Sequence, residues 1–152
     1  MKVTVDSNIL VYTADRREPA RQRSSIAMVD AIGRAGGILT LQAVGEFLHV
    51  TVRKRITTPE HACARVDELL RAFPPPAAAS VAALATARRF WMAHRFGFWD
   101  ALLLATAASA GCAAIISEDM APGAELDGLR VVGAFDPTGA IAPAVRDLLG
   151  LG

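Results

Sequence analysis

The chain has 152 residues, of which 53% are hydrophobic and 20% are charged, and this balance suits a globular protein and excludes intrinsic disorder. The formal net charge is only +1, so any nucleic-acid binding would have to use local basic patches. Cys63 and Cys112 lie too far apart for a disulfide framework or a zinc motif, and the reducing cytoplasm is the simplest compartment.

The apolar content also bears on membranes and on partners. The apolar stretch from residue 101 to 116 is too short for a membrane span, and acidic residues interrupt the N-terminus, so we expect neither a signal peptide nor a membrane protein. The mean hydropathy of +0.34 is high for a protein without a membrane span, which suggests a buried interface with a partner or a second copy of the chain.

Predicted strands and predicted helices alternate along the chain. Apolar runs rich in β-formers predict strands, and apolar residues at helical spacing between capping residues and glycine or proline predict helices. The predicted strands are residues 3–5, 38–40, 113–116 and 129–132, and the predicted helices are roughly 20–35, 41–55, 59–73, 80–94, 101–110 and 141–149. This order predicts a three-layer α/β/α fold with a small, mostly parallel central sheet. We expect one domain over residues 1–152, with a core at about 2–135 and a short C-terminal tail at 136–152.

The helix predicted over residues 41–55 carries two different faces. Its core-facing side is predicted to hold four apolar residues, and its other side four polar ones. The apolar set is Leu41, Val44, Leu48 and Val52, and the polar set is Gln42, Glu46, His49 and Arg53.

Four acidic residues are candidates for a shared site. Asp6 and Asp119 follow predicted strands, where α/β sheets bind ligands, Asp100 starts a predicted helix, and Glu46 lies on the polar face just described. Each acid also has an ordinary explanation: Asp6 and Asp100 as helix caps, Asp119 as a turn residue and Glu46 as a solvated helix residue.

The surroundings of Asp100 favour a metal site. Phe98, Trp99 and residues 102–104 flank it, and burying an unpaired carboxylate among such residues costs several kcal/mol. Carboxylates brought close together also repel one another, and a divalent cation removes both costs. Since the candidate ligands are all oxygens, they point to Mg²⁺ or Mn²⁺, which suits phosphodiester hydrolysis by an activated water.

Four motifs then match a known family in the right order. They are Val5-Asp6-Ser7-Asn8-Ile9-Leu10, Gln42-Ala43-Val44-Gly45-Glu46-Phe47, Phe98-Trp99-Asp100-Ala101-Leu102-Leu103 and Ile116-Ser117-Glu118-Asp119-Met120. In these residues the chain resembles the PIN domain, especially the VapC-type toxins of bacterial toxin–antitoxin pairs. The resemblance runs from Val3 to about Phe135; it departs at Gly133-Ala134-Phe135, where the family often has Asn-Pro-Phe.

The resemblance implies a metal-dependent endoribonuclease, with RNA as substrate and an antitoxin as partner. Asp6, Glu46, Asp100 and Asp119 would hold Mg²⁺ or Mn²⁺ and carry catalysis, supported by Ser7, Asn8 and Ser117. We expect a cytoplasmic homodimer. The alternative is a non-catalytic module that holds a metal or a basic peptide in the same acidic pocket. A phosphotransfer domain ranks last, because neither Lys2 nor Lys54 is placed for it.

Two basic runs and two single residues complete the candidates. Arg16, Arg17 and Arg21 are candidate RNA contacts, with a solvated surface an equal explanation. For the run at 53–55 the solvated explanation is favoured. We expect Glu118 to point to solvent, although an outer metal ligand is the alternative. His49 either orients Glu46 or contacts substrate, but a packed or solvated histidine is the favoured explanation.

Overall fold

The computed structural model describes residues 1–152, which form seven helices and four strands. The strands are β1 (Lys2–Val5), β2 (Cys112–Ser117), β3 (Glu125–Leu126) and β4 (Leu129–Gly133). The helices are α1 (Ser7–Ala14), α2 (Pro19–Arg34), α3 (Leu41–Arg53), α4 (Pro59–Ala72), α5 (Val81–Met92), α6 (Phe98–Ser109) and α7 (Pro143–Leu149). No helix is both long enough and apolar enough to span a membrane.

The four strands form one sheet in the order β1-β2-β4-β3. β1 pairs with β2 and β2 with β4 in parallel, and only the two-residue β3 runs antiparallel, at the edge. The predicted small, mostly parallel sheet is therefore confirmed. Because β1 and β2 are parallel neighbours, with Val5 opposite Ile116, the residues that follow them emerge side by side.

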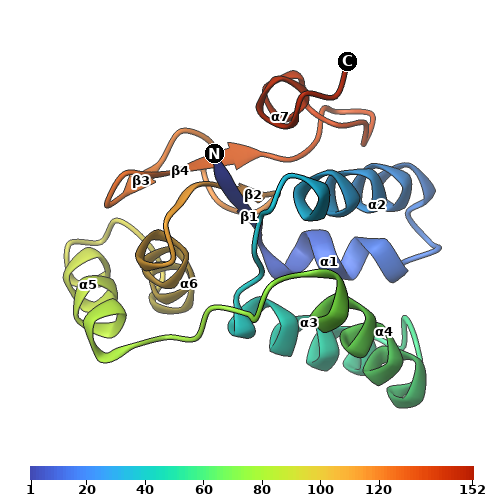
Figure 1. Cartoon of the computed structure of the whole chain (residues 1–152), viewed down its shortest axis with the longest axis horizontal. Coiled ribbons are helices and arrows are strands. Elements are labelled where there is room, and N and C mark those ends of the chain that lie inside the picture. Colours follow the sequence, from blue (N-terminus) through green and yellow to red (C-terminus); the bar gives the residue numbers. More distant parts are fainter.

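Helices cover both faces of the sheet. Figure 1 shows α1 and α2 on one side of the sheet and α5 and α6 on the other. α3 packs against α1, and α4 packs against α3 farther from the sheet. One cluster of 33 buried apolar residues runs through these layers. The predicted α/β architecture is confirmed.

The strand predicted at residues 38–40 is wrong. This segment is buried, but it makes only one hydrogen bond to β1, from Ile38 N to the Val3 carbonyl at 3.2 Å, and then bonds to Ala77 instead. The segment cannot continue beside β1, because Thr40 already caps α3 by accepting a hydrogen bond from Ala43 N. Helix capping thus ends the pairing before a ladder forms.

The core-facing side predicted for α3 is also partly wrong. Ala43, Val44, Phe47 and Thr51 are buried, whereas Leu41 is 51% exposed. Phe47 and Thr51 lie four residues apart, so the buried stripe is rotated from the predicted one, with Leu48 and Val52 half-buried at its edge.

The C-terminal tail is part of the core. Its helix α7 packs against α2 and β4, with Val145 fully buried, and Phe135 pairs with Ile141 in an isolated bridge before it. Ser24 of α2 donates a 2.8 Å hydrogen bond to the Gly139 carbonyl, which fixes the turn between β4 and α7. Residues 136–152 therefore extend the layer on the α2 side.

Candidate metal-dependent active site

Asp6 lies at the carboxyl end of β1, where the chain turns into α1. Its Oδ1 accepts a hydrogen bond from Ser7 N at 2.7 Å, so it caps α1, as its ordinary explanation predicted. Its Oδ2 accepts a 2.8 Å bond from the hydroxyl of Ser117, the last residue of β2. The side chain is thus fixed between the two strand ends, and the residue is only 7% exposed. Asp6 therefore both caps α1 and belongs to the candidate site.

Glu46 reaches this position from α3. Its Oε2 accepts a 2.7 Å hydrogen bond from the Ser7 hydroxyl, and its Oε1 accepts a 2.9 Å bond from Gln42, one turn earlier on the helix. The same Gln42 nitrogen donates to the Trp99 carbonyl at 3.0 Å, which connects α3 to the start of α6. Glu46 is therefore not a freely solvated carboxylate.

Asp119 follows β2 and is connected to Asp6 through Asn8. The Asn8 amide donates at 3.0 Å to Asp119 Oδ2 and at 3.4 Å to Asp6 Oδ2. The Ser117 hydroxyl accepts from Asp119 N at 3.2 Å, and it is the same hydroxyl that donates to Asp6. The three supporting residues, Ser7, Asn8 and Ser117, thus join Asp6 to the other two acids.

Asp100 lies in the first turn of α6, and its side chain makes no hydrogen bond or ion pair. The apolar surroundings predicted for it hold only on one side, because Ala101–Leu104 are buried while Trp99 is 65% exposed and Asp100 itself is exposed. The prediction that its carboxylate is buried is wrong. The pKa of Asp100 is raised by partial desolvation of its carboxylate and by the negative charges of Glu46 and Asp119.

The pKa of Asp6 is raised as well. Burial is the main cause, and the charges of Asp100 and Glu46 add to it, while the hydrogen bonds from Ser117 and Ser7 oppose it. Two neighbouring amide oxygens, Asn8 Oδ1 and Gln42 Oε1, are buried without a hydrogen-bond partner. Oxygen atoms in this state commonly accept from a water or bind an ion.

The chemistry of the donor atoms in this site suits a hard divalent cation. The candidate ligands are carboxylate oxygens whose mutual repulsion a divalent ion would remove. They do not form a closed cage as they stand, because no three acidic, histidine or cysteine side chains are close enough together to hold one ion. Binding would therefore require the unpaired side chain of Asp100 and the side chain of Asp119, which Asn8 holds by a hydrogen bond, to move toward Asp6.

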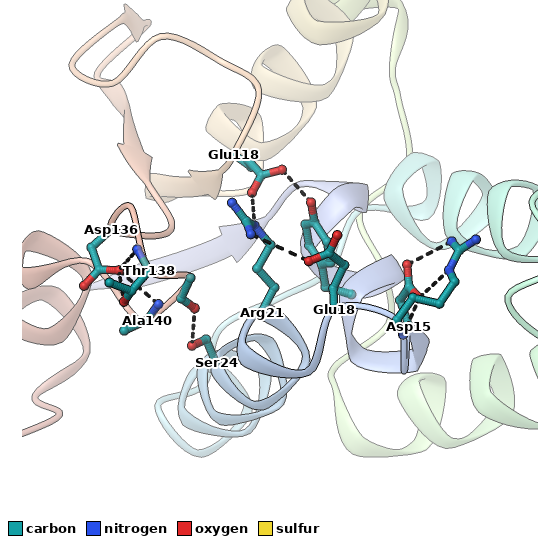
Figure 2. A network of polar contacts seen from close by, with 11 residues as sticks. Asp15, Glu18, Arg21, Ser24, Glu118, Asp136, Thr138 and Ala140 are labelled. Atoms are coloured by element: carbon teal, nitrogen blue, oxygen red, sulfur yellow. Dashed lines mark hydrogen bonds and ion pairs between the residues drawn. The ribbon is translucent and has the colours of Figure 1, made fainter.

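The arginines predicted to contact RNA differ in whether an acidic residue of the chain already pairs with them. Arg16 is exposed and unpaired, whereas Arg17 forms a two-bond ion pair with the buried Asp15, at 2.9 and 3.0 Å. Arg21 lies between Glu118, at 2.8 Å, and Glu18, at 3.8 Å (Figure 2).

The expectation that Glu118 points to solvent is wrong, because both of its oxygens accept hydrogen bonds, one from Arg21 and one from Tyr12. His49 is exposed and makes no hydrogen bond to Glu46. The sequence reasoning placed Gln42 on the face of Glu46 but gave it no role in the site, although their spacing of four residues on a helix was the available signal.

The PIN domain family model matches residues 3–121, which include all four acids. The chain belongs to the PIN domain family. No curated protein matches it by sequence. Among solved structures, this PIN domain is similar to VapBC2 from Rickettsia felis bound to a DNA fragment from their promoter. The two share a TM-score of 0.65 and 12% sequence identity, over 88% of this chain and 98% of the other. At this identity the likeness concerns the fold.

Proposed function

We propose that this PIN domain is a Mg²⁺- or Mn²⁺-dependent endoribonuclease, the toxin of a toxin–antitoxin pair. PIN domains are generally nucleases, and the chain retains an acid at each of the four positions. The observation that carries the proposal is the network at the ends of β1 and β2, in which Ser7 joins Asp6 to Glu46 and Asn8 joins Asp6 to Asp119. Acidic side chains on an ordinary solvated surface would not need to be held in place by such a network of hydrogen bonds.

The residues would divide the work as follows. A divalent ion held by Asp6, Glu46, Asp100 and Asp119 would supply polarisation of the phosphodiester and activation of the attacking water. Ser117 and Ser7 hold the Asp6 carboxylate in one orientation, with both of its oxygens engaged. The Asp100 side chain has no hydrogen-bond partner, so of the four carboxylates it is the one that the chain leaves free to turn toward the ion or the substrate.

Partners and compartment are part of the proposal. The VapBC2 neighbour pairs a toxin-type chain with an antitoxin, and by analogy we propose an antitoxin for this chain and a cytoplasmic location. A second copy of the chain is the occupant that we propose for the outer side of α5 and the start of α6. This surface supports a homodimer because large apolar side chains are exposed on it: Val81, Leu84, Trp91, Met92 and Trp99.

Cleavage of a labelled RNA by the purified chain tests the enzyme. We expect cleavage with Mn²⁺ or Mg²⁺ that EDTA abolishes, and we expect Asp6→Asn and Asp100→Asn to lose it while keeping the circular dichroism spectrum of the wild type. Asp30→Asn is the matched control, because Asp30 is an exposed acid of α2 outside the site. Cleavage that both site variants retain would refute the proposal. Metal binding without any cleavage would support the non-catalytic alternative instead.

A further inference from the structure

Two basic runs that lie far apart in the sequence meet beside the acids. Arg16 and Arg17 follow α1, and the run from Arg53 to Arg55 ends α3; the packing of α1 on α3 brings the two ends together. Arg17, Arg53 and Lys54 line one hollow of about 470 Å³, and Arg17 also lines a second hollow of about 630 Å³ with Arg16 and Arg55. We refer to Arg16, Arg17, Arg53, Lys54 and Arg55 as the basic surface.

The first hollow connects the basic surface to the acids. Its wall also contains Ser7, Asn8 and Asp119, which belong to the network around Asp6. The second hollow continues past Arg17 to the far side of the basic surface, where Asp15 is the only acidic residue of the lining. A single groove-like path therefore leads from Asp119 to Arg55.

Several cations along this path take part in no ion pair, although acidic residues line it too. Of the acids in the first hollow other than Asp119, Asp15 pairs with Arg17, and Glu118 and Glu18 both pair with Arg21. Arg16, Arg53, Lys54 and Arg55 are exposed and take part in no ion pair with another residue of the chain. Since the whole chain carries only +1, these unpaired cations are a local concentration rather than a consequence of a basic protein.

The backbone that carries three of these cations is fixed. Arg55 has a φ of 55°, and α3 ends with hydrogen bonds from Arg55 N to the Val52 carbonyl and from Ile56 N to the Thr51 carbonyl. This arrangement usually has glycine at the left-handed position, because a side chain there is strained. An arginine at this position keeps a cation at the rim of the second hollow.

We propose that Arg16, Arg53, Lys54 and Arg55 bind backbone phosphates of a single-stranded RNA whose scissile bond lies at the acids. The placement of the scissile bond at the acids rests on the proposed function, but the binding of RNA by the basic surface does not require cleavage. A positively charged groove that leads away from a reactive centre is how proteins hold a single strand without reading its sequence. Arg17 is left out of the set because Asp15 already occupies its guanidinium.

Binding of a short fluorescent single-stranded RNA of mixed sequence tests the proposal, measured by anisotropy with the full chain in EDTA so that nothing is cleaved. We expect Arg53→Gln, Lys54→Gln and Arg16→Gln each to weaken binding several-fold. Each should also reduce the slope of log affinity against log salt by about 0.7, the value per phosphate contact for single strands. Arg88→Gln is the matched control, because Arg88 is exposed and unpaired on α5, away from both hollows.

Arg55→Gly separates binding from folding. Glycine relieves the left-handed backbone, so the midpoint of thermal unfolding should rise while RNA affinity falls. A merely structural arginine would not give these opposite changes. If affinity and salt slope stay at the wild-type values in all four variants, or if the wild type binds no RNA, the proposal is overturned.

The outcomes also separate this proposal from the assigned activity. RNA cleavage with unaltered binding by the variants would refute the basic surface and leave the nuclease standing. Salt-dependent binding that the variants weaken, without cleavage in Mn²⁺, would support the surface and refute the nuclease. Binding of an acidic partner protein in place of RNA would appear as wild-type RNA affinity in all variants and would count against the proposal.

Discussion

The hydroxyl of Tyr12 donates a 2.6 Å hydrogen bond to Oε1 of Glu118, the residue that immediately precedes Asp119. Arg21 donates to the other carboxylate oxygen (Figure 2). Its guanidinium lies 5.9 Å from the ring centroid of Tyr12 and 5.5 Å from that of Phe135. Burial and the contact with Glu118 raise the pKa of Tyr12, so its hydroxyl remains a donor well into the alkaline range. α1, α2 and the segment after β2 are thereby joined next to the site.

Tyr12→Phe should destabilise the chain and slow cleavage. It removes one hydrogen bond to a carboxylate, and because Tyr12 and Glu118 are half-buried and water can replace part of the bond, we expect a loss of about 1 kcal/mol in the free energy of unfolding. The looser segment should position Asp119 less well, so kcat for RNA cleavage should fall while KM stays unchanged. Urea unfolding and steady-state kinetics measure the two effects.

A double-mutant cycle identifies the source of that change. Glu118→Gln and Tyr12→Phe should be non-additive, since each removes a partner in the same contact. Arg21→Lys keeps the charge but loses the planar guanidinium over the rings of Tyr12 and Phe135. We expect it to lower both the free energy of unfolding and the rate of RNA cleavage. Full additivity of the first pair would mean that Glu118 and Tyr12 act independently.

Ser117→Ala should be costly, in contrast to Ser25→Ala. Both serines are fully buried, but the Ser117 hydroxyl bonds to Asp6 and accepts from two backbone N–H groups, whereas the Ser25 hydroxyl has no partner. Leaving those groups unpaired should cost about 1–3 kcal/mol. For a chain of this size that corresponds to a fall of roughly 2–10 °C in Tm.

Ser25→Ala is the matched control, and calorimetry provides the comparison. It removes a buried hydroxyl that makes no hydrogen bond, so we expect Tm to stay unchanged or to rise. Equal losses in the two variants would show that the bonds of Ser117 contribute nothing beyond packing.

Arg17→Ala should destabilise the chain in a pH-dependent way. The hydrogen bonds and charge of Arg17 are the main cause of the lowered pKa of Asp15. Because the folded-state pKa lies below the unfolded value of 3.8, the stability from this pair is complete above pH 3.8 and is lost as the pH falls through the folded pKa. The difference in unfolding free energy between wild type and Arg17→Ala should therefore be largest near pH 7 and shrink in acid. A difference independent of pH would contradict this assignment.

Sequence reasoning located the sheet because its strands are continuous apolar runs next to turn residues. It failed at residues 38–40, where the apolar run is the same but the cap of α3 ends the pairing after one hydrogen bond to β1. It failed again on the face of α3, because spacing alone does not say that Phe47 rather than Leu48 points inward. Both errors concern tertiary contacts, which a local pattern does not contain.

The candidate site shows the same limit. Asp6, Asp100 and Asp119 were predictable from their places after strands or at a helix start, and Glu46 from its place on the polar face of its helix. The structure joins three of the four acids through Ser7, Asn8 and Ser117. Sequence could not show that Asp100 is exposed, since its apolar neighbours turn to the core while the carboxylate turns away. It also could not show the pairing of Glu118 with Tyr12, because these residues are 106 positions apart.

Asp100→Asn should stabilise the metal-free chain while it abolishes cleavage. The pKa of Asp100 is raised by desolvation and by the charges of Glu46 and Asp119, so the ionised form is disfavoured in the folded chain. The resulting destabilisation is absent below the unfolded value of 3.8 and is complete above the folded pKa, so removing the charge should help most near neutral pH. Thermal unfolding in EDTA at pH 7 should give a higher Tm for Asp100→Asn than for wild type, and the gain should vanish in acid. Added Mg²⁺ should raise the Tm of the wild type and not that of the variant, because a ligand of the folded state stabilises only a chain that binds it. A variant that is less stable than wild type in EDTA would show that the Asp100 carboxylate is not under repulsion from its neighbours.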